Sequence, residues 1–104
     1  MEPMTIIRIF DTTIEPSDVE EAKTLFREQV KPAFDRFEGC QGIEMSLGVE
    51  EHSKDLVDVA AISRWDSMAS IERAIATDEY QEALRELRAL FQETPLVRHF
   101  EKVE

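Results

Sequence analysis

Arg8 is the side chain whose type and position point most directly to chemistry. It lies within residues 4–10, MTIIRIF, a run whose isoleucines predict a buried strand. A cation placed between apolar neighbours requires an anionic partner, because an unpaired buried charge is strongly unfavourable. That partner is either a carboxylate on a neighbouring strand, such as Glu44 or Asp58, which is the simpler explanation, or an acidic or phenolic oxygen of a ligand.

The two histidines are the other candidates for proton transfer, since only they titrate near neutral pH without a shifted pKa. His99 lies on a predicted strand and is a possible acid or base, although a position at the surface or at a dimer edge is the simpler interpretation. His52 falls in a predicted hairpin loop, where we expect it to be solvated. With the single cysteine, Cys40, these residues form no metal-ligand cluster of recognised spacing, and we expect no metal site.

Composition limits the classes of partner. The chain has 104 residues, which predicts one domain spanning 1–104, and its net charge of −11 argues against nucleic acid and anionic membranes as partners. No apolar run is long enough to span a membrane, and the first residues lack the basic and apolar regions of a signal peptide. A single cysteine excludes an internal disulfide and fits a reducing compartment, so we expect a cytoplasmic protein.

Hydrophobic periodicity predicts elements in the order β-α-β-β-α-β, in which the second α consists of a short helix followed by a longer one. The predicted strands cover residues 4–10, 42–51, 57–65 and 96–103, and the predicted helices cover 17–37, 68–75 and 78–91. Pro32 predicts a kink within the first helix, and Asp66 and Asp78 are the expected N-caps of the later two. This order predicts an α+β fold, the ferredoxin-like plait, with an antiparallel four-stranded sheet and the helices on one face.

The other face of that sheet leads us to expect a homodimer. Residues such as Ile7 and Ile9 would form a large exposed apolar patch in a monomer. Pairing sheet to sheet with a symmetric copy would cover it.

Two stretches of the chain resemble a known family. Residues 63–84, SRWDSMASIERAIATDEYQEAL, comprise a strand ending in Trp and a small polar residue, an Ala-rich short helix and a Thr-x-x-Tyr joint. Residues 38–42, Glu-Gly-Cys-Gln-Gly, form a Gly-bracketed turn in which Glu38 replaces the usual Pro. Together they resemble the antibiotic-biosynthesis monooxygenase superfamily, whose members are dimeric α/β-barrel proteins.

The resemblance implies a ligand pocket between the sheet and the helices of each subunit. It places Arg8, Tyr80 and His99 as candidate catalytic groups, and it implies contacts to a small hydrophobic or aromatic molecule from Phe10, Phe34, Trp65, Ile71, Ile75 and Leu84. The apolar members also fit a plain core, because any packed helix needs such stripes. Trp65 also fits a role as scaffold.

The resemblance further implies a cofactor-independent monooxygenase that oxidises a small aromatic or quinol-like substrate with O₂. The alternative is a non-catalytic dimeric ligand-binding or stress-response protein of the same fold. A heme-degrading branch of the superfamily uses Asn, Trp and His at positions that hold Phe10, Ala74 and Leu84 in this chain. Heme degradation is therefore disfavoured.

Overall fold

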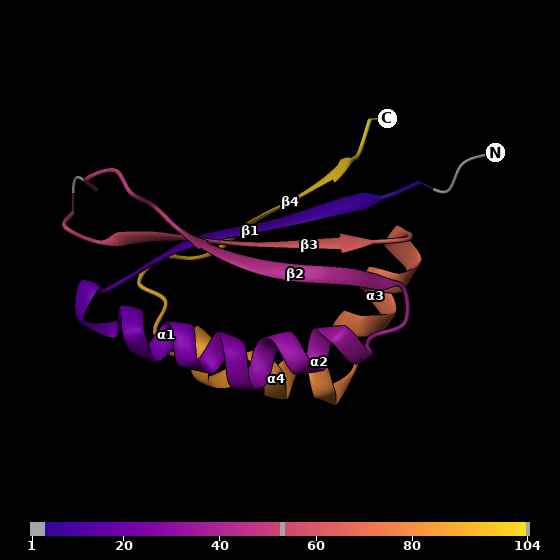
Figure 1. Ribbon diagram of the computed structural model, residues 1–104, viewed down its shortest axis with the longest axis horizontal. Helices are drawn as coiled ribbons and strands as arrows, with labels where there is room; N and C mark the ends of the chain where they lie inside the picture. The colour runs from indigo at the N-terminus through magenta and orange to yellow at the C-terminus, as the bar shows by residue number, and fades with distance from the viewer. Residues whose placement is uncertain (1–3, 53, 104) are drawn as a thin grey trace.

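Four antiparallel strands form one sheet in the order β2-β3-β1-β4. The computed structural model describes residues 4–52 and 54–103. The strands are β1 (Ile6–Ile14), β2 (Cys40–Leu47), β3 (Val57–Trp65) and β4 (Leu96–Glu101). Figure 1 shows the helices α1, α2 and α4 beneath one face of this sheet, and the predicted ferredoxin-like plait is confirmed.

The first helical segment is divided in three. After a 3₁₀ turn η1 (Pro16–Asp18), the helix α1 (Val19–Leu25) passes into a π-helical turn η2 (Phe26–Val30) and then α2 (Lys31–Arg36). The N–H of Lys31 donates to the carbonyl of Phe26, five residues back. Pro32 explains the change, because it offers no N–H and its ring crowds the preceding turn. The predicted kink is thus a π-helical turn that continues the helix.

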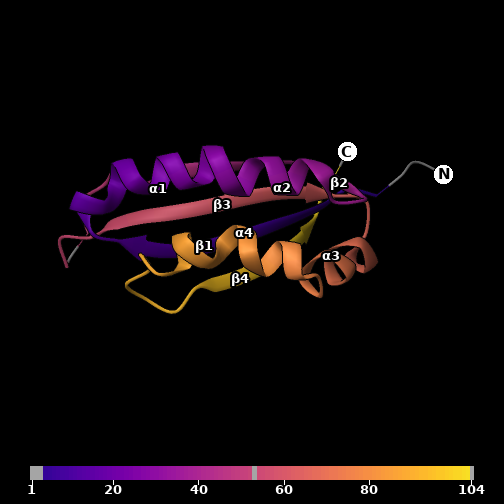
Figure 2. The ribbon, with the colours of Figure 1, turned by 90° about the horizontal axis from the view of Figure 1, so that it is seen from below.

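Short polar side chains begin the two later helices, α3 (Met68–Ile75) and α4 (Asp78–Arg88). The N-caps are Ser67 and Thr77, whose side chains accept hydrogen bonds from the N–H groups of Ser70 and Tyr80. The predicted caps Asp66 and Asp78 were each wrong by one residue. Figure 2 shows α4 beside α1 and α2 across the sheet, with α3 at the end of the layer.

Strand β1 is longer than predicted. Residues 11–13, Asp-Thr-Thr, continue it to Ile14 instead of ending it, because they pair with residues 58–60 of β3. The side chains of Thr12 and Thr13 also have partners outside the sheet. The Thr12 hydroxyl donates to the carbonyl of Glu93 (2.7 Å), and the Thr13 hydroxyl donates to the Glu93 carboxylate (2.9 Å). The loop between α4 and β4 is thereby attached to β1.

The turn between α2 and β2 depends on Gly39, which has φ +85°. A Cβ at this position would lie 2.3 Å from the Ser70 hydroxyl oxygen and 2.5 Å from Asp66 Oδ1. The Ser70 hydroxyl donates to the same Asp66 oxygen at 2.5 Å, and this hydrogen bond is the main reason why the pKa of Asp66 is lowered. Glycine is therefore required here by backbone conformation and by close approach together.

The core lies between the sheet and the helices and contains a cluster of four aromatic rings. Phe34 packs against Phe37, Tyr80 and Trp65 with ring centroids 5.3, 5.5 and 6.1 Å apart. These spacings are those of favourable aromatic pairs. The cluster connects α2, α4 and the end of β3, so it holds both helices against the sheet.

The opposite face of the sheet carries no helix in the described part of the chain (Figure 1). Ile7, Ile9 and Ile62 on this face are partly exposed, and every residue of β4 is exposed, including Leu96 at 54% and Phe100 at 47%. The apolar patch expected from the sequence is present. Within residues 4–52 and 54–103, no helix has the length and apolar character needed to cross a membrane.

Candidate functional site

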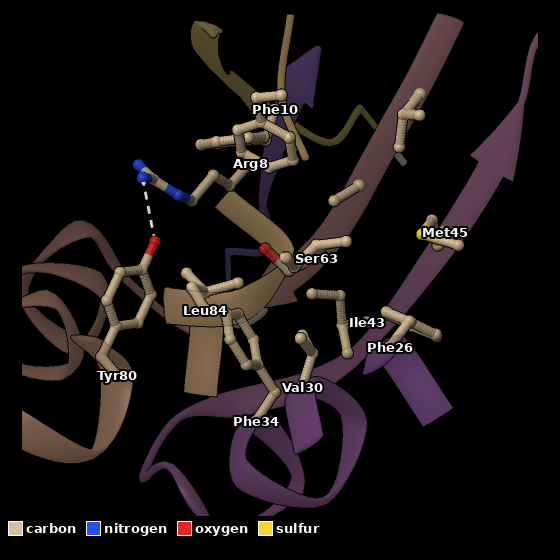
Figure 3. A pocket seen from close by; sticks show the side chains of 14 residues that line it. Arg8, Phe10, Phe26, Val30, Phe34, Ile43, Met45, Ser63, Tyr80 and Leu84 are labelled. Carbon is tan, nitrogen blue, oxygen red and sulfur yellow. Dashed lines mark hydrogen bonds between the residues drawn. The ribbon is translucent and has the colours of Figure 1, made fainter. Parts of the chain in front are cut away.

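A cavity lies between the sheet and the helices, where β1, β2 and β3 face the π-helical turn η2 and α4 (Figure 3). Its lining is apolar apart from three polar side chains. The lining residues are Arg8, Phe10, Phe26, Val30, Phe34, Ile43, Met45, Val59, Ala61, Ser63, Tyr80, Leu84, Leu87 and Phe91.

The cavity is small in this conformation, with a volume of about 30 Å³. That is enough for a water molecule, whereas pockets that hold small organic ligands measure roughly 300–1,000 Å³. Entry of an aromatic ring therefore requires the lining side chains to move apart. Flexible Met45 and the π-helical turn that supplies Phe26 and Val30 are the parts best suited to do so.

Arg8 projects from β1 toward α4 and is only 9% exposed. Its Nη2 donates to the Tyr80 hydroxyl at 3.3 Å (Figure 3), and its Nη1 lies 2.7 Å from Nε2 of His99. Both partners are uncharged when His99 is neutral. Within residues 4–52 and 54–103, no carboxylate lies within 4.0 Å of the guanidinium.

The carboxylate pairing considered as the simpler explanation for Arg8 was wrong. Glu44 instead accepts a hydrogen bond from Arg64 at 2.8 Å, on the face of the sheet away from the helices. Asp58 lies 4.0 Å from His52. Strand alternation explains the error, since the even-numbered residues of β3, and those of β2 from Gly42 onward, point away from the face that carries Arg8.

His99 lies directly opposite Arg8 in the pairing of β1 with β4. Its pKa is lowered, first by desolvation and then by the positive charge of Arg8. The imidazole is therefore neutral near neutral pH, and since Arg8 only donates, Nε2 carries the lone pair and Nδ1 the proton. His99 is thus a base whose free electron pair faces the guanidinium.

Tyr80 is positioned by the start of α4. The Thr77 hydroxyl oxygen accepts from the Tyr80 N–H at 3.1 Å, and the ring packs against Phe34 and Phe37 with the side chain 2% exposed. This places the phenol oxygen at the edge of the cavity beside Arg8 (Figure 3). The Thr-x-x-Tyr joint seen in the sequence therefore fixes a polar group at the site.

Ser63 is a polar lining residue that the sequence did not single out. It is 3% exposed, lies directly opposite Arg8 in the pairing of β1 with β3, and accepts a hydrogen bond from the Trp65 indole N–H at 2.8 Å. Its signal in the sequence was weak: a serine on the side of the strand that otherwise carries Val57, Val59, Ala61 and Trp65.

The structure brings together only part of the predicted site. Phe10, Phe34 and Leu84 line the cavity together with Arg8 and Tyr80, while His99 reaches it only through its contact with Arg8. Three predicted contacts lie outside the lining: Trp65, Ile71 and Ile75. Trp65 is fully buried near the end of β3, and both isoleucines belong to α3, which packs at the end of the layer (Figure 2).

His52 is less exposed than predicted, with 18% of its side chain accessible. Its Nδ1 accepts from the backbone N–H of Lys54, and its Nε2 lies 3.9 Å from the Glu93 carboxylate. Hydrogen bonds from Thr13 and then Lys54 lower the pKa of Glu93. His52 thus belongs to a polar cluster at the loops and lies outside the cavity lining.

The family follows from the sequence as a whole. A family model described as antibiotic biosynthesis monooxygenase matches residues 5–86. The chain belongs to this family. No curated protein matches the sequence significantly.

Solved structures share the fold at low sequence identity. A protein of Nitrosomonas europaea, provisionally named as an antibiotic biosynthesis monooxygenase, superposes with a TM-score of 0.76 at 10% identity, over 99% of this chain and 94% of that one. A protein of Bordetella bronchiseptica with the same provisional name superposes with a TM-score of 0.74 at 18% identity, over 97% of this chain and 99% of that one. A conserved protein from Methanosarcina mazei superposes with a TM-score of 0.71 at 16% identity, over 94% of this chain and 92% of that one.

The side chains at the site bear on metal and heme chemistry. Within the described ranges 4–52 and 54–103, no three His, Cys, Asp or Glu residues gather as metal ligands. Phe10 and Leu84, which the resemblance aligns with two of the residues used by the heme-degrading branch, line the cavity with carbon atoms only. Such side chains offer no ligand to iron.

Proposed function

We propose that this protein is a cofactor-independent monooxygenase that oxidises a small aromatic or quinol-like substrate with O₂. The observation that carries the proposal is Arg8, a buried guanidinium that faces an apolar cavity and has only neutral hydrogen-bond partners in the described part of the chain. A desolvated cation in this setting favours an anionic ligand oxygen over any neutral one. A deprotonated phenol or quinol supplies such an oxygen together with an apolar ring.

Each polar group then has a role in the reaction. For His99 to accept the proton of the substrate through Nε2, the Arg8 guanidinium must first turn from this atom toward the substrate oxygen. The guanidinium and the Tyr80 hydroxyl then donate hydrogen bonds to the oxyanion that forms. The electron-rich carbanion form of the substrate transfers electrons to O₂, and one oxygen atom forms a bond to the reacting carbon. For a CH₂ centre the balance is R₂CH₂ + O₂ → R₂C=O + H₂O, with the second oxygen atom leaving as water.

The apolar lining contributes by excluding water. In its closed form the cavity has room for about one water molecule. A bound aromatic ring would displace that water and separate the side chains that now pack together, so the reaction would take place without solvent. Phe10 and Phe91 form an aromatic pair in the lining, with ring centroids 5.5 Å apart. A planar substrate can stack against such rings once they separate.

We also propose that the protein works as a homodimer in the cytoplasm, with the uncovered faces of two sheets packed together. Ile9, Ile62 and Phe100 lie on that face and remain partly exposed in the single chain. Covering them with a second copy removes apolar surface from water and closes a symmetric interface.

Oxygen consumption tests the proposal. A panel of quinols, naphthols and anthrone-like compounds is supplied to the protein in an oxygen electrode, and products are identified by mass spectrometry after ¹⁸O₂ labelling. We expect one atom of ¹⁸O in the product and loss of turnover in Arg8→Met. Arg27→Met, which removes an exposed arginine of η2, is the matched control and should keep full activity.

A non-catalytic dimeric ligand-binding or stress-response protein of the same fold is the second candidate. The cavity lining offers few polar groups for a reaction, namely Arg8, Ser63 and Tyr80, and this favours a protein without catalytic activity. If this is the function, phenols bind to the protein and bind more weakly to Arg8→Met, yet no compound of the panel gives rise to O₂ consumption. Equal oxygen consumption by Arg8→Met and the unmodified protein would instead remove Arg8 from the reaction.

A further inference from the structure

The hydroxyl hydrogen of Ser63 has no acceptor in the described part of the chain. Ser63 is 3% exposed, and in the described part of the chain its oxygen has one hydrogen-bond partner, the indole N–H of Trp65 at 2.8 Å. An indole N–H is only a donor, so the serine oxygen accepts in this bond. The hydroxyl hydrogen remains free to be donated elsewhere, and a buried donor without an acceptor is unfavourable.

The position of Ser63 directs that donor into the cavity. Ser63 lies on the face of β3 turned toward the helices, is part of the cavity lining, and pairs directly with Arg8 across the β1–β3 ladder. Directly opposed residues of antiparallel strands have Cβ atoms about 5 Å apart. In Figure 3 the Ser63 hydroxyl oxygen points toward the side of the cavity where Arg8 and Tyr80 lie.

Trp65 decides which way this hydroxyl can point. The indole is fully buried and packs against Phe34 and Phe37, so its N–H cannot move away from Ser63. Because the indole occupies one acceptor direction of the serine oxygen, the hydroxyl hydrogen is excluded from that direction. This gives the buried tryptophan a positioning role although it does not line the cavity.

We infer that Ser63 is a ligand-binding residue, whose hydroxyl donates to a second oxygen of the bound molecule, and that Trp65 positions it. The inference rests on the proposed function for the first oxygen, the one bound by Arg8. It narrows the substrate class to aromatic compounds that carry an ionisable hydroxyl together with a carbonyl-type acceptor. Two fixed polar contacts in an apolar site also set the orientation of the ring.

Shape-matched ligands test the second contact. The binding constants of 3- and 4-hydroxyacetophenone are measured by titration calorimetry at one fixed pH, alongside those of 3- and 4-isopropylphenol, which lack the carbonyl oxygen. Each ligand is measured with the unmodified protein, Ser63→Ala and Ser63→Thr. Comparing each ligand with itself across the variants removes the effect of the different phenol acidities.

We expect Ser63→Ala to weaken binding of at least one hydroxyacetophenone by about two- to tenfold, the effect of one hydrogen bond. Binding of the isopropylphenols should change by less than about twofold, and Ser63→Thr, which keeps a hydroxyl, should restore the preference. Equal weakening of both ligand classes, or no weakening of either, overturns the inference. If none of the four phenols binds the unmodified protein, the proposed function itself fails and the Ser63 contact fails with it.

Two further measurements test the positioning role of Trp65. Trp65 is the single tryptophan of the chain, so its fluorescence reports this hydrogen bond directly. In Ser63→Ala the emission should shift to shorter wavelength because the indole loses its acceptor, whereas Ser63→Thr should retain the original maximum. Trp65→Phe should reduce the preference for hydroxyacetophenones while leaving isopropylphenol binding in place; an unchanged preference would show that Trp65 does not direct the hydroxyl.

Discussion

Replacing Arg8 and Tyr80 together by Met and Phe should make the protein more stable while abolishing its affinity for phenolates. Arg8 is 9% exposed and Tyr80 2%, and the guanidinium has no carboxylate partner among residues 4–52 and 54–103. Exchanging a buried charge network for apolar residues of similar volume is often neutral or stabilising by about 1–4 kcal/mol. His99 is exposed, so water can replace the contact that it loses.

The single variants separate the contributions. The bond from Arg8 to Tyr80 measures 3.3 Å, which is long, so Tyr80→Phe should cost near the lower end of the range for a hydrogen bond to a charged group, about 1.5 kcal/mol. Arg8→Met removes the buried charge but leaves the Tyr80 hydroxyl without a partner, a cost of about 1–3 kcal/mol that offsets the gain. We therefore expect Tyr80→Phe to be the least stable of the four proteins and the double variant to be the most stable. The unmodified protein and Arg8→Met should have about equal stability between these two.

Urea and thermal unfolding provide the assay. A gain of 1 kcal/mol corresponds to an increase in Tm of roughly 4 °C for a domain of about this size. All four proteins must be compared at one concentration, because subunit pairing would also contribute to the apparent stability. A double variant less stable than the unmodified protein by more than about 1 kcal/mol would refute the reasoning, since it would mean that the charge of Arg8 is compensated in the folded state.

Three other predictions concern a proton, a turn and the uncovered face. NMR titration should give His99 a pKa below 6.5, and Arg8→Met should raise it, because Arg8 is the second cause of the shift. Since the unfolded chain then binds this proton more tightly, stability should fall as the pH is lowered through about 6.5, less steeply in Arg8→Met. Gly39→Ala should lower the free energy of unfolding by about 2 kcal/mol or more, because its Cβ would lie 2.3 Å from the Ser70 oxygen at φ +85°. Ile62→Glu should dissociate the proposed homodimer in sedimentation velocity experiments.

Controls keep these three results interpretable. Gln41→Ala, an exposed neighbour of the Gly39 turn, should change stability by less than about 0.5 kcal/mol. A His99 pKa that does not respond to Arg8→Met would contradict the geometry of their contact. For the dimer, Glu28→Gln on the exposed helical side should leave the sedimentation coefficient unchanged, and an unmodified protein that sediments as a monomer would rule out the pairing of sheets.

The sequence by itself determined the elements of this protein and their order. Residues 57–65 alternate and residues 68–75 repeat at helical spacing, so local pattern alone predicted both β3 and α3 with their observed bounds. It also identified Arg8 as a buried cation that needs a partner. Local pattern succeeded in these places because backbone propensity, side-chain alternation and helix caps all act within a few residues along the chain.

The tertiary structure alone decided what surrounds Arg8. Its partners Tyr80 and His99 lie 72 and 91 residues away, and its cross-strand neighbour Ser63 lies on a strand that alternation marked only as apolar. It also placed Trp65 behind the cavity instead of in its wall. Such contacts depend on strand order and register, which are set when separate segments pack together, and no local pattern along the chain carries that information.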